Sequence, residues 1–351
     1  MILNASGCLD ALTAPEVARA LDVFVTKTVT PLPREGNQPV RIAETDVGML
    51  NSIGLANPGI DRFLADVLPQ LLELGPPVWV SVGGFAAEDY ADLCGRLDGT
   101  GAAALELNLS CPNAAAPEDE ATAIVTAARA ATGKPLYAKL APGLPDLPAV
   151  AEAAAAAGAD GLSLVNTIRG LALDPATLLP RLSTGSGGLS GPALRPIALA
   201  AVHAAYGATR LPIVGLGGVE TGRHALELIA AGAIAVGLGT VLFGDPAAPA
   251  RVREELAAEA AALGLGNPME ACGIAHREDA SPLPELANML ISKEKSHLNR
   301  SEALLESRAD AGFQSAGAGT ASVPRPAHGR VAARERDSGP ARAAQEGPEE
   351  R

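Results

Sequence analysis

Short apolar runs alternate with longer, Ala-rich stretches along residues 1–280. Eight of these runs are rich in Val, Ile and Leu, at residues 1–5, 22–29, 78–84, 103–110, 136–142, 161–167, 212–218 and 233–240. A continuous apolar run bounded by turn residues is typical of a strand that is buried on both faces. The pattern therefore predicts the strands of a parallel sheet.

The stretches between these runs have helical periodicity. Candidate helices cover residues 58–74, 86–97, 118–131, 147–157, 193–206, 222–231 and 247–263. Eight strand and helix units in about 260 residues favour an α/β fold of the (β/α)8 TIM barrel type. An open doubly wound sheet is the alternative, but it would place a GxGxxG motif after the first strand, and that motif is absent.

The character of the chain changes after the predicted barrel. Residues 312–351 are rich in Ala, Gly, Ser, Pro and Arg and contain almost no large apolar side chain. Such a segment cannot offset its ordering entropy by burial, so we expect a disordered C-terminal tail. Residues 281–311 have some helical periodicity, which leaves a helical extension open. We therefore place the barrel in residues 1–280.

Composition and charge exclude several classes of protein. With 27 basic and 40 acidic side chains the net charge is −13, which is unfavourable for binding nucleic acid. No apolar stretch approaches the roughly 20 residues of a membrane span, and no signal peptide is visible. The four cysteines form no CxxC pair, which argues against a structural metal site and suits the reducing cytoplasm.

Candidate chemistry lies at the ends of the predicted strands, where barrel enzymes have their active sites. The residues there are Ser6, Lys27, Thr28, Ser81, Asn108, Lys139, Asn166, Thr167, Gly217, Gly218, Gly239 and Thr240. Lysine is rarely buried without a partner, so the two lysines predict an anionic or electron-rich ligand. The glycine turns after the last two strands predict a phosphate site built from backbone N–H groups.

A cysteine follows the fourth predicted strand. Cys111 lies in the stretch LELNLSCPN, residues 105–113, between the carboxamides of Asn108 and Asn113. Most free cysteines are small buried apolar residues. A thiol has an ordinary pKa of about 8.5, however, and at a barrel mouth it can act as a general base.

Taken together, these motifs resemble the class 1 dihydroorotate dehydrogenases. The matching segments are ASG at 5–7, VTKTVTPLPREGN at 25–37, GMLNSIGLANPGID at 48–61, LNLSCPN at 107–113, YAKLAP at 137–142, SLVNT at 163–167 and TGSGGLSGPALRPIAL at 184–199. They occur in the family's order over about residues 2–260. Within this family, SGGLSGPALRP and TPLPREGN are most similar to the class 1B, NAD-linked catalytic subunit.

The resemblance implies FMN as the cofactor. The implied FMN contacts are Ser6, Lys27, Thr28, Asn108, Lys139, Val165, Gly191, Gly217, Gly218, Gly239 and Thr240. Lys139 would have a catalytic role at the pyrimidine edge of the flavin, where a fixed positive charge stabilises the anionic reduced form.

The resemblance also implies dihydroorotate as substrate and orotate as product in pyrimidine (UMP) biosynthesis. The implied substrate contacts are Lys27, Asn51, Ser52, Ile53, Gly54, Leu55, Asn108, Asn113, Asn166 and Thr167. Carboxamides and a lysine suit a planar ring that carries a carboxylate. Cys111 would take the C5 proton while FMN takes the C6 hydride, and the segment TVTPLPREGN after Lys27 would form a loop over the mouth.

Class 1B membership implies a second subunit that carries FAD and a [2Fe–2S] cluster, in a heterotetramer, whereas the catalytic chain alone would form a homodimer. NAD+ through this partner and fumarate both remain open as electron acceptors. Two other functions remain open: the FMN barrel of a dihydropyrimidine dehydrogenase, and a degenerate flavin-binding protein without turnover.

Overall fold

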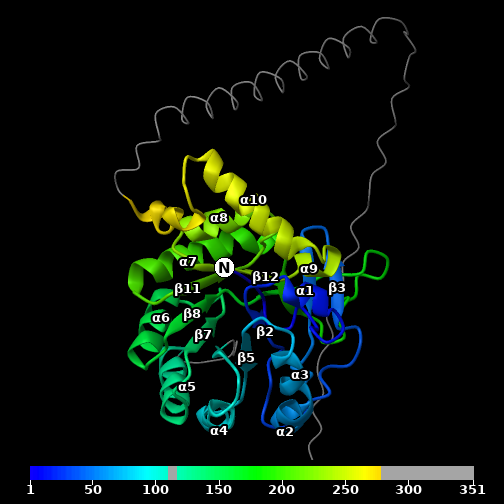
Figure 1. Ribbon diagram of the computed structural model, residues 1–351. Helices are drawn as coiled ribbons and strands as arrows, with labels where there is room; N and C mark the ends of the chain where they lie inside the picture. The colour runs from blue at the N-terminus through cyan, green and yellow to red at the C-terminus, as the bar shows by residue number, and fades with distance from the viewer. Residues whose placement is uncertain (110–116, 278–351) are drawn as a thin grey trace, which may run out of the picture. The chain divides into compact units, whose positions relative to one another are not determined.

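Eight parallel strands form one sheet that curves round on itself (Figure 1). The computed structural model describes residues 1–109 and 117–277. In spatial order the strands are β1 (Ile2–Asn4), β12 (Ala235–Leu238), β11 (Ile213–Leu216), β8 (Gly161–Leu164), β7 (Leu136–Leu140), β6 (Ala104–Asn108), β5 (Val78–Val82) and β2 (Phe24–Val25). Each of the eight apolar runs contains one of these strands, so the predicted barrel is confirmed.

The first and second barrel strands meet at a seam that one side chain completes. Leu3 and Val23 form a single parallel bridge there. Beside it the buried carboxamide of Asn4 accepts from the Val25 amide at 2.8 Å and donates to the Val25 carbonyl at 2.7 Å. The Asn4 side chain thus replaces the backbone hydrogen bonds that such short strands cannot supply.

Helices surround the barrel and cover its outer face. They are α2 (Gly59–Arg62), a π-helical turn (Phe63–Val67), α3 (Leu68–Leu72), α4 (Ala87–Asp98), α5 (Pro117–Ala131), α6 (Leu147–Ala156), α7 (Arg195–Ala208), α8 (Gly222–Ala230) and α10 (Ala248–Ala262). All seven predicted helical stretches are present, although residues 58–74 are divided by the π-helical turn. The sequence pattern missed the one-turn elements, because a segment of three to five residues is too short to show a helical period.

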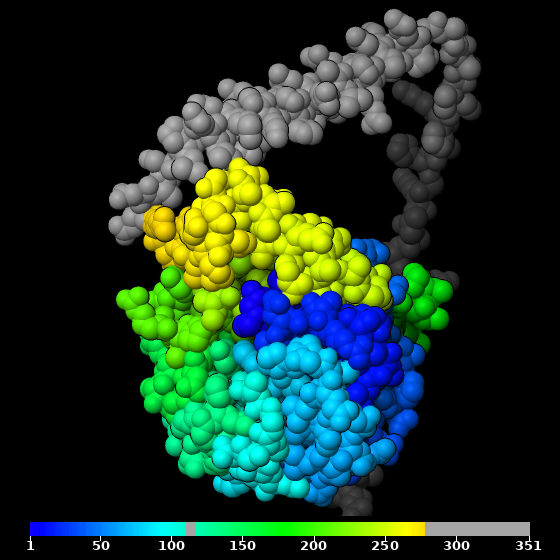
Figure 2. All heavy atoms as spheres, in the orientation of Figure 1, coloured from blue at the N-terminus to red at the C-terminus, as the bar shows by residue number. Residues whose placement is uncertain are grey.

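Those one-turn elements lie before, between and after the longer helices. They are α1 (Pro15–Arg19), α9 (Val241–Gly244) and three 3-10 turns (Pro192–Leu194, Pro268–Ala271 and Ile274–His276). Figure 2 shows α10, in yellow, lying along the N-terminal segment, in dark blue. Arg253 of α10 pairs there with Asp22 at 2.9 Å. The last long helix is thus tied to the turn that leads into β2.

Aromatic side chains fill the barrel interior toward the amino ends of the strands. The ring centroids of Trp79 and Tyr137 lie 4.2 Å apart, with an angle of 33° between the ring planes. Both rings pack with Leu3, Val25 and neighbouring apolar residues. Gly161 leaves room for this pair, since a Cβ there would collide with the Tyr137 ring. The aromatic pair thus fills the barrel at its amino end.

A second, antiparallel sheet was not predicted. Its order is β3 (Ile42–Thr45), β4 (Gly48–Asn51), β10 (Gly187–Ser190) and β9 (Ile168–Gly170). One hairpin follows β2 and the other strands follow β8, so both come from carboxyl ends of barrel strands. The sheet therefore belongs to the end of the barrel where the polar residues gather.

Candidate active site

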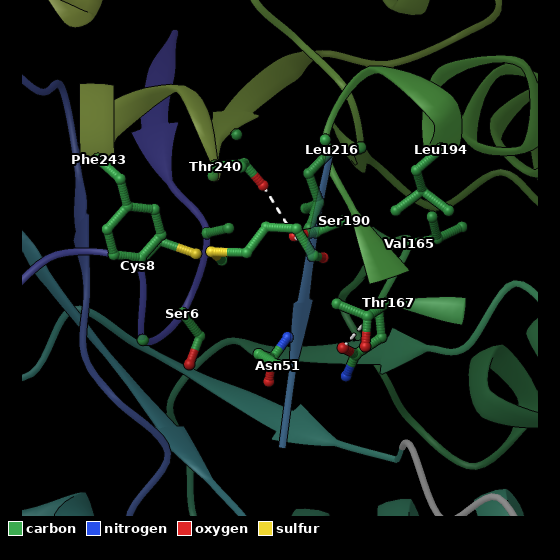
Figure 3. Close-up of a pocket in the computed structure, with 18 of the residues that line it drawn as sticks. Ser6, Cys8, Asn51, Val165, Thr167, Ser190, Leu194, Leu216, Thr240 and Phe243 are labelled. Atoms are coloured by element: carbon green, nitrogen blue, oxygen red, sulfur yellow. Dashed lines mark hydrogen bonds between the residues drawn. The ribbon is translucent and has the colours of Figure 1, made fainter. Parts of the chain in front are cut away.

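A cavity of 440 Å³ opens at the carboxyl ends of the barrel strands (Figure 3). Barrel residues and residues of the antiparallel sheet line it together. Lys27, Asn108 and Lys139 come from barrel strand ends, whereas Met49 and Ser190 come from the antiparallel sheet. A hydrogen bond from Thr240 Oγ1 to Ser190 Oγ, 2.8 Å long and dashed in Figure 3, joins the segment after β12 to β10 of the antiparallel sheet.

The residues predicted to contact FMN all line this one cavity. They are Ser6, Lys27, Thr28, Asn108, Lys139, Val165, Gly191, Gly217, Gly218, Gly239 and Thr240. They come from segments that lie far apart in the sequence. Parallel barrel strands bring all but one of them to the same edge, and the exception, Gly191, follows β10 of the antiparallel sheet. Ser81, in contrast, is fully buried outside the lining, where its hydroxyl contacts Thr28 Oγ1 at 3.0 Å.

The residues predicted to contact substrate are divided. Lys27, Asn51, Ile53, Leu55, Asn108, Asn166 and Thr167 line the cavity. Ser52 and Gly54 do not, because the Ser52 hydroxyl accepts from Asn37 Nδ2 at 2.8 Å and the Gly54 carbonyl accepts from Arg34 Nε at 3.3 Å. Cys111 and Asn113 lie outside the described residues.

Two amines give the cavity wall a positive charge. Lys139 is buried, and its Nζ lies 3.4 Å from Oε1 of the equally buried Glu106. Burial lowers the pKa of Lys27, and the charge on Lys139 lowers it further. The arrangement suits a ligand that brings negative charge to both amines.

Hydrogen bonds fix the orientation of the carboxamides. Asn166 Nδ2 donates to Asn108 Oδ1 at 3.1 Å, and Asn166 Oδ1 accepts from the Thr167 amide at 2.7 Å. The Tyr90 hydroxyl donates to the backbone carbonyl of Asn108, at the end of β6, at 2.8 Å. The amide groups therefore present donors and acceptors in a defined pattern, as recognition of a planar polar ring requires.

The glycine turns after β11 and β12 provide a cradle of the kind that a phosphate group needs. Gly217 and Gly218 have φ values of +131° and +70°, and a Cβ on Gly218 would lie 2.8 Å from the Arg195 backbone nitrogen. The backbone amides of Gly218, Gly239 and Thr240 donate no hydrogen bond to a described residue. These free donors and the close backbone approach fit a flavin phosphate.

Some cavity residues escaped the sequence interpretation. Cys8 was not among the predicted site residues, yet it lines the cavity, where burial raises the pKa of its thiol and the charges of Lys139 and Lys27 lower it. Ile42, Met49 and Ser190 line it from the antiparallel sheet. A turn at residues 46–48 between two short apolar segments was the available signal for that sheet.

The described residues contain neither a metal site nor a membrane-spanning helix. Among them no group of three or more His, Cys, Asp or Glu side chains could hold a metal ion. Within residues 1–109 and 117–277 no helix is both long enough and apolar enough to cross a membrane.

The closed parallel barrel, with lysines, carboxamides and glycine turns around one cavity at its carboxyl end, defines a (β/α)8-barrel enzyme. A family model described as dihydroorotate dehydrogenase matches residues 1–259, and the chain belongs to this family. The resemblance inferred from the sequence motifs is thereby confirmed. Members of the family are oxidoreductases that oxidise dihydroorotate in pyrimidine biosynthesis and depend in general on a flavin.

Individual relatives agree with this assignment. The catalytic subunit of dihydroorotate dehydrogenase B (NAD(+)) from Desulforudis audaxviator is 44% identical over 289 residues, which cover 79% of this chain and 94% of the relative. A putative dihydroorotate dehydrogenase A (fumarate) from Solibacter usitatus is 46% identical over 245 residues, covering 68% and 81%. The ligand-free enzyme from Eimeria tenella superposes with a TM-score of 0.66 at 27% identity, covering 78% and 88%.

Proposed function

We propose that this chain oxidises dihydroorotate to orotate with FMN bound in the cavity. The observation that carries the proposal is the gathering of two lysines, the carboxamides of Asn108 and Asn166 and the free amides of the glycine turns around one space of 440 Å³. These groups match the charges and polar edges of a flavin phosphate, a flavin pyrimidine ring and a carboxylated substrate ring.

The chain's own residues would hold the cofactor at both ends. The amides of Gly218, Gly239 and Thr240 would bind the phosphate, and Lys139 would lie at the pyrimidine edge of the ring system. When bound, FMN supplies the hydride-accepting chemistry. A buried ammonium at that edge stabilises negative charge as it develops, without any rearrangement of solvent.

Substrate binding would use the other lysine and the carboxamides. Lys27 would pair with the substrate carboxylate, while Asn51, Asn108, Asn166 and Thr167 would bond the ring N–H and C=O groups. By resemblance to the family, the Cys111 thiolate would take the proton from C5 while the hydride at C6 leaves toward the flavin. Proton and hydride together account for both hydrogens lost when dihydroorotate becomes orotate.

The route by which electrons leave is also part of the proposal. The class 1B resemblance favours a second subunit that carries FAD and a [2Fe–2S] cluster and passes electrons to NAD+, in a heterotetramer in the cytoplasm. The relative from Desulforudis audaxviator is named for NAD(+) and the one from Solibacter usitatus for fumarate. Fumarate as acceptor, with the chain as a homodimer, is therefore the alternative.

Anaerobic titration of the purified chain tests the proposed function. The protein should carry one FMN, and dihydroorotate should bleach its absorbance in a stoichiometric titration. Dihydrouracil serves as the matched control, since it lacks the carboxylate that Lys27 would bind, and it should reduce the flavin poorly. Reduction by dihydrouracil alone would point to a dihydropyrimidine dehydrogenase, and bound flavin that neither compound reduces would indicate loss of turnover.

A further inference from the structure

One ion pair lies inside the barrel, just below the cavity. Glu106 is in β6 and Lys139 in β7, and Asn108 rather than Glu106 is the direct cross-strand partner of Lys139. Glu106 is 3% exposed and Lys139 is 6% exposed. Lys139 lines the cavity, whereas Glu106 lies outside the lining. The carboxylate therefore reaches a cavity ligand only through the lysine.

The surroundings of Lys139 are otherwise unfavourable for a positive charge. The titratable groups that face it are Glu106 from β6, Lys27 after β2 and Cys8 after β1. Lys27 repels it, and the Cys8 thiol has a raised pKa and so stays neutral near neutral pH. The neighbour on β8, Ser163, is uncharged. Only the carboxylate of Glu106 compensates the buried ammonium within this group.

We propose that Glu106 is a positioning residue, which keeps Lys139 protonated and held toward the flavin pyrimidine edge. The inference rests on the proposed function, because the flavin is the group that would sense the charge. A buried ammonium without its counter-ion is costly, and it loses its proton instead. Without Glu106 the catalytic charge would therefore depend on pH.

The test uses the flavin-loaded chain and the variant Glu106→Gln, which is close to isosteric but uncharged. The FMN midpoint potential is measured against pH, together with the affinity for sulfite, which adds to flavin N5 and reports on positive charge near the pyrimidine edge. In the variant both quantities should show a new break on the acid side of the range in which an exposed lysine releases its proton, because burial disfavours the unpaired ammonium. Above the break the sulfite affinity should fall about tenfold relative to wild type.

Two further variants assign the break to the pair. Glu106→Gln/Lys139→Met contains no titrating amine at this place and should show no new break. Ser163→Ala is the matched control, because Ser163 is also buried and is the neighbour of Lys139 on β8 but has no charge. It should keep the wild-type pH dependence. A Glu106→Gln profile that coincides with wild type would overturn the proposal.

Unfolding of the apoproteins in urea separates this inference from the proposed function. The loss of stability in Glu106→Gln and in Lys139→Met should each exceed the loss in the double variant, whether or not flavin binds. If wild type takes up no flavin, the proposed function fails while the cycle still tests the pair. A single variant that fails to fold beside a folded double variant supports the pair, and failure of both would mean that Glu106 serves packing alone.

Discussion

The cysteine thiols of the described residues are kept protonated near neutral pH by their surroundings. Burial raises the pKa of Cys94 to about 12. It also raises the pKa values of Cys8 and Cys272. None of these three is therefore suited to act as a general base. The candidate that the family resemblance names is the thiol of Cys111, which lies outside the described residues.

Replacing Cys111 should separate cofactor binding from chemistry. Cys111→Ala should retain FMN but slow flavin reduction by dihydroorotate by about 10²–10⁴-fold, which is the usual contribution of a positioned base. Cys111→Ser should recover activity only at higher pH, since a hydroxyl gives up its proton less readily. Stopped-flow measurement of flavin bleaching reads both, with Cys272→Ala as a control outside the cavity. An unchanged rate in Cys111→Ala would remove this thiol from the mechanism.

Gly218 should be needed for FMN binding because of its backbone conformation. At a φ of +70°, an Ala would be strained, and its Cβ would lie 2.8 Å from Arg195 Cβ. Gly218→Ala should cost about 1–3 kcal/mol and reduce the FMN content. Gly207→Ala is the control, since Gly207 is in α7 and a Cβ there would meet no other atom within 4 Å, and it should stabilise by about 0.4–1 kcal/mol. Thermal unfolding and flavin absorbance measure both, and equal effects would contradict the argument.

At the scale of elements, the barrel strands were predictable and the antiparallel sheet was not. β5 is VWVSV and is buried throughout, so its apolar run is continuous and easily recognised. β3 is IAET and only one of its residues is buried. Its sheet also joins β4 to β10, where Asn51 faces Gly188 across a long stretch of sequence. The half-exposed hairpin of β3 and β4 leaves only a weak local pattern, the turn at residues 46–48, and the distant pairing of β4 with β10 leaves none.

The same contrast applies to the site. Polar residues at strand ends are visible in the sequence because they interrupt apolar runs, and this is why Lys27, Asn108 and Lys139 were recognised. Whether Ser52 and Gly54 face the cavity depends on their contacts with Asn37 and Arg34 in another loop. Only the folded chain brings these residues together. The family motif alone does not distinguish residues that face the cavity from those that support the loop.

Asn37 should act on substrate binding through this loop. Its side chain donates to the Ser52 carbonyl at 3.1 Å and to the Ser52 hydroxyl at 2.8 Å, and its amide donates to the Ile53 carbonyl at 3.0 Å. Asn37→Ala removes two hydrogen bonds of about 0.5–1.5 kcal/mol each, so KM for dihydroorotate should rise about tenfold with a smaller change in kcat. Steady-state kinetics with a dye acceptor measure this.

The control for Asn37 lies in the segment between β9 and β10. Asp174 accepts from the amides of Ala176 and Thr177 and from the Thr177 hydroxyl, and it does not line the cavity. Asp174→Ala should therefore leave KM unchanged. A similar rise in KM for both variants would indicate general loosening rather than support of residues 51–55.

Asp98, at the contact between the end of α4 and the segment after α5, should make stability depend on pH. It ends α4 and accepts from Thr132 Oγ1 at 2.6 Å and from the Gly133 amide at 2.8 Å, and these hydrogen bonds lower its pKa below the ordinary value of 3.8. A lowered folded-state pKa stabilises above the unfolded value, and the contribution is lost as pH falls through the folded pKa. Asp98→Asn should be less stable than wild type at about pH 6.5, and the difference should shrink toward about pH 3.

Urea denaturation at both pH values checks this prediction. Glu88→Gln, on the same helix, is the control, because it removes one carboxylate without touching the contacts with Thr132 and Gly133. A stability difference for Asp98→Asn that stays constant with pH would show that shape, rather than charge, makes the Asp98 contacts important.

Among the described residues of the whole molecule, those that line the cavity come from the barrel and from the antiparallel sheet at its carboxyl end. The cavity residues run from Ala5 to Phe243, and the family model ends at residue 259. Our expectation for residues 281–351 falls outside the described residues and stays a prediction. The net charge of −13 suggests that a partner subunit would present a basic surface, which would affect mainly the rate of encounter.

The barrel alone does not determine the electron acceptor. The sequence lacks two features that direct electron transfer to NAD+ would need. No GxGxxG motif follows a strand, and the cysteines at positions 8, 94, 111 and 272 are too dispersed for an iron–sulfur cluster. If the class 1B assignment holds, the isolated chain should be reduced by dihydroorotate and should reduce artificial dyes, yet pass electrons to NAD+ negligibly. Anaerobic reduction followed by mixing with each acceptor in turn measures this.

Rapid NAD+ reduction by the single chain would contradict the need for a partner. Rapid turnover with fumarate would instead place the chain with the fumarate-linked class, to which the 46% identical relative from Solibacter usitatus is assigned by name.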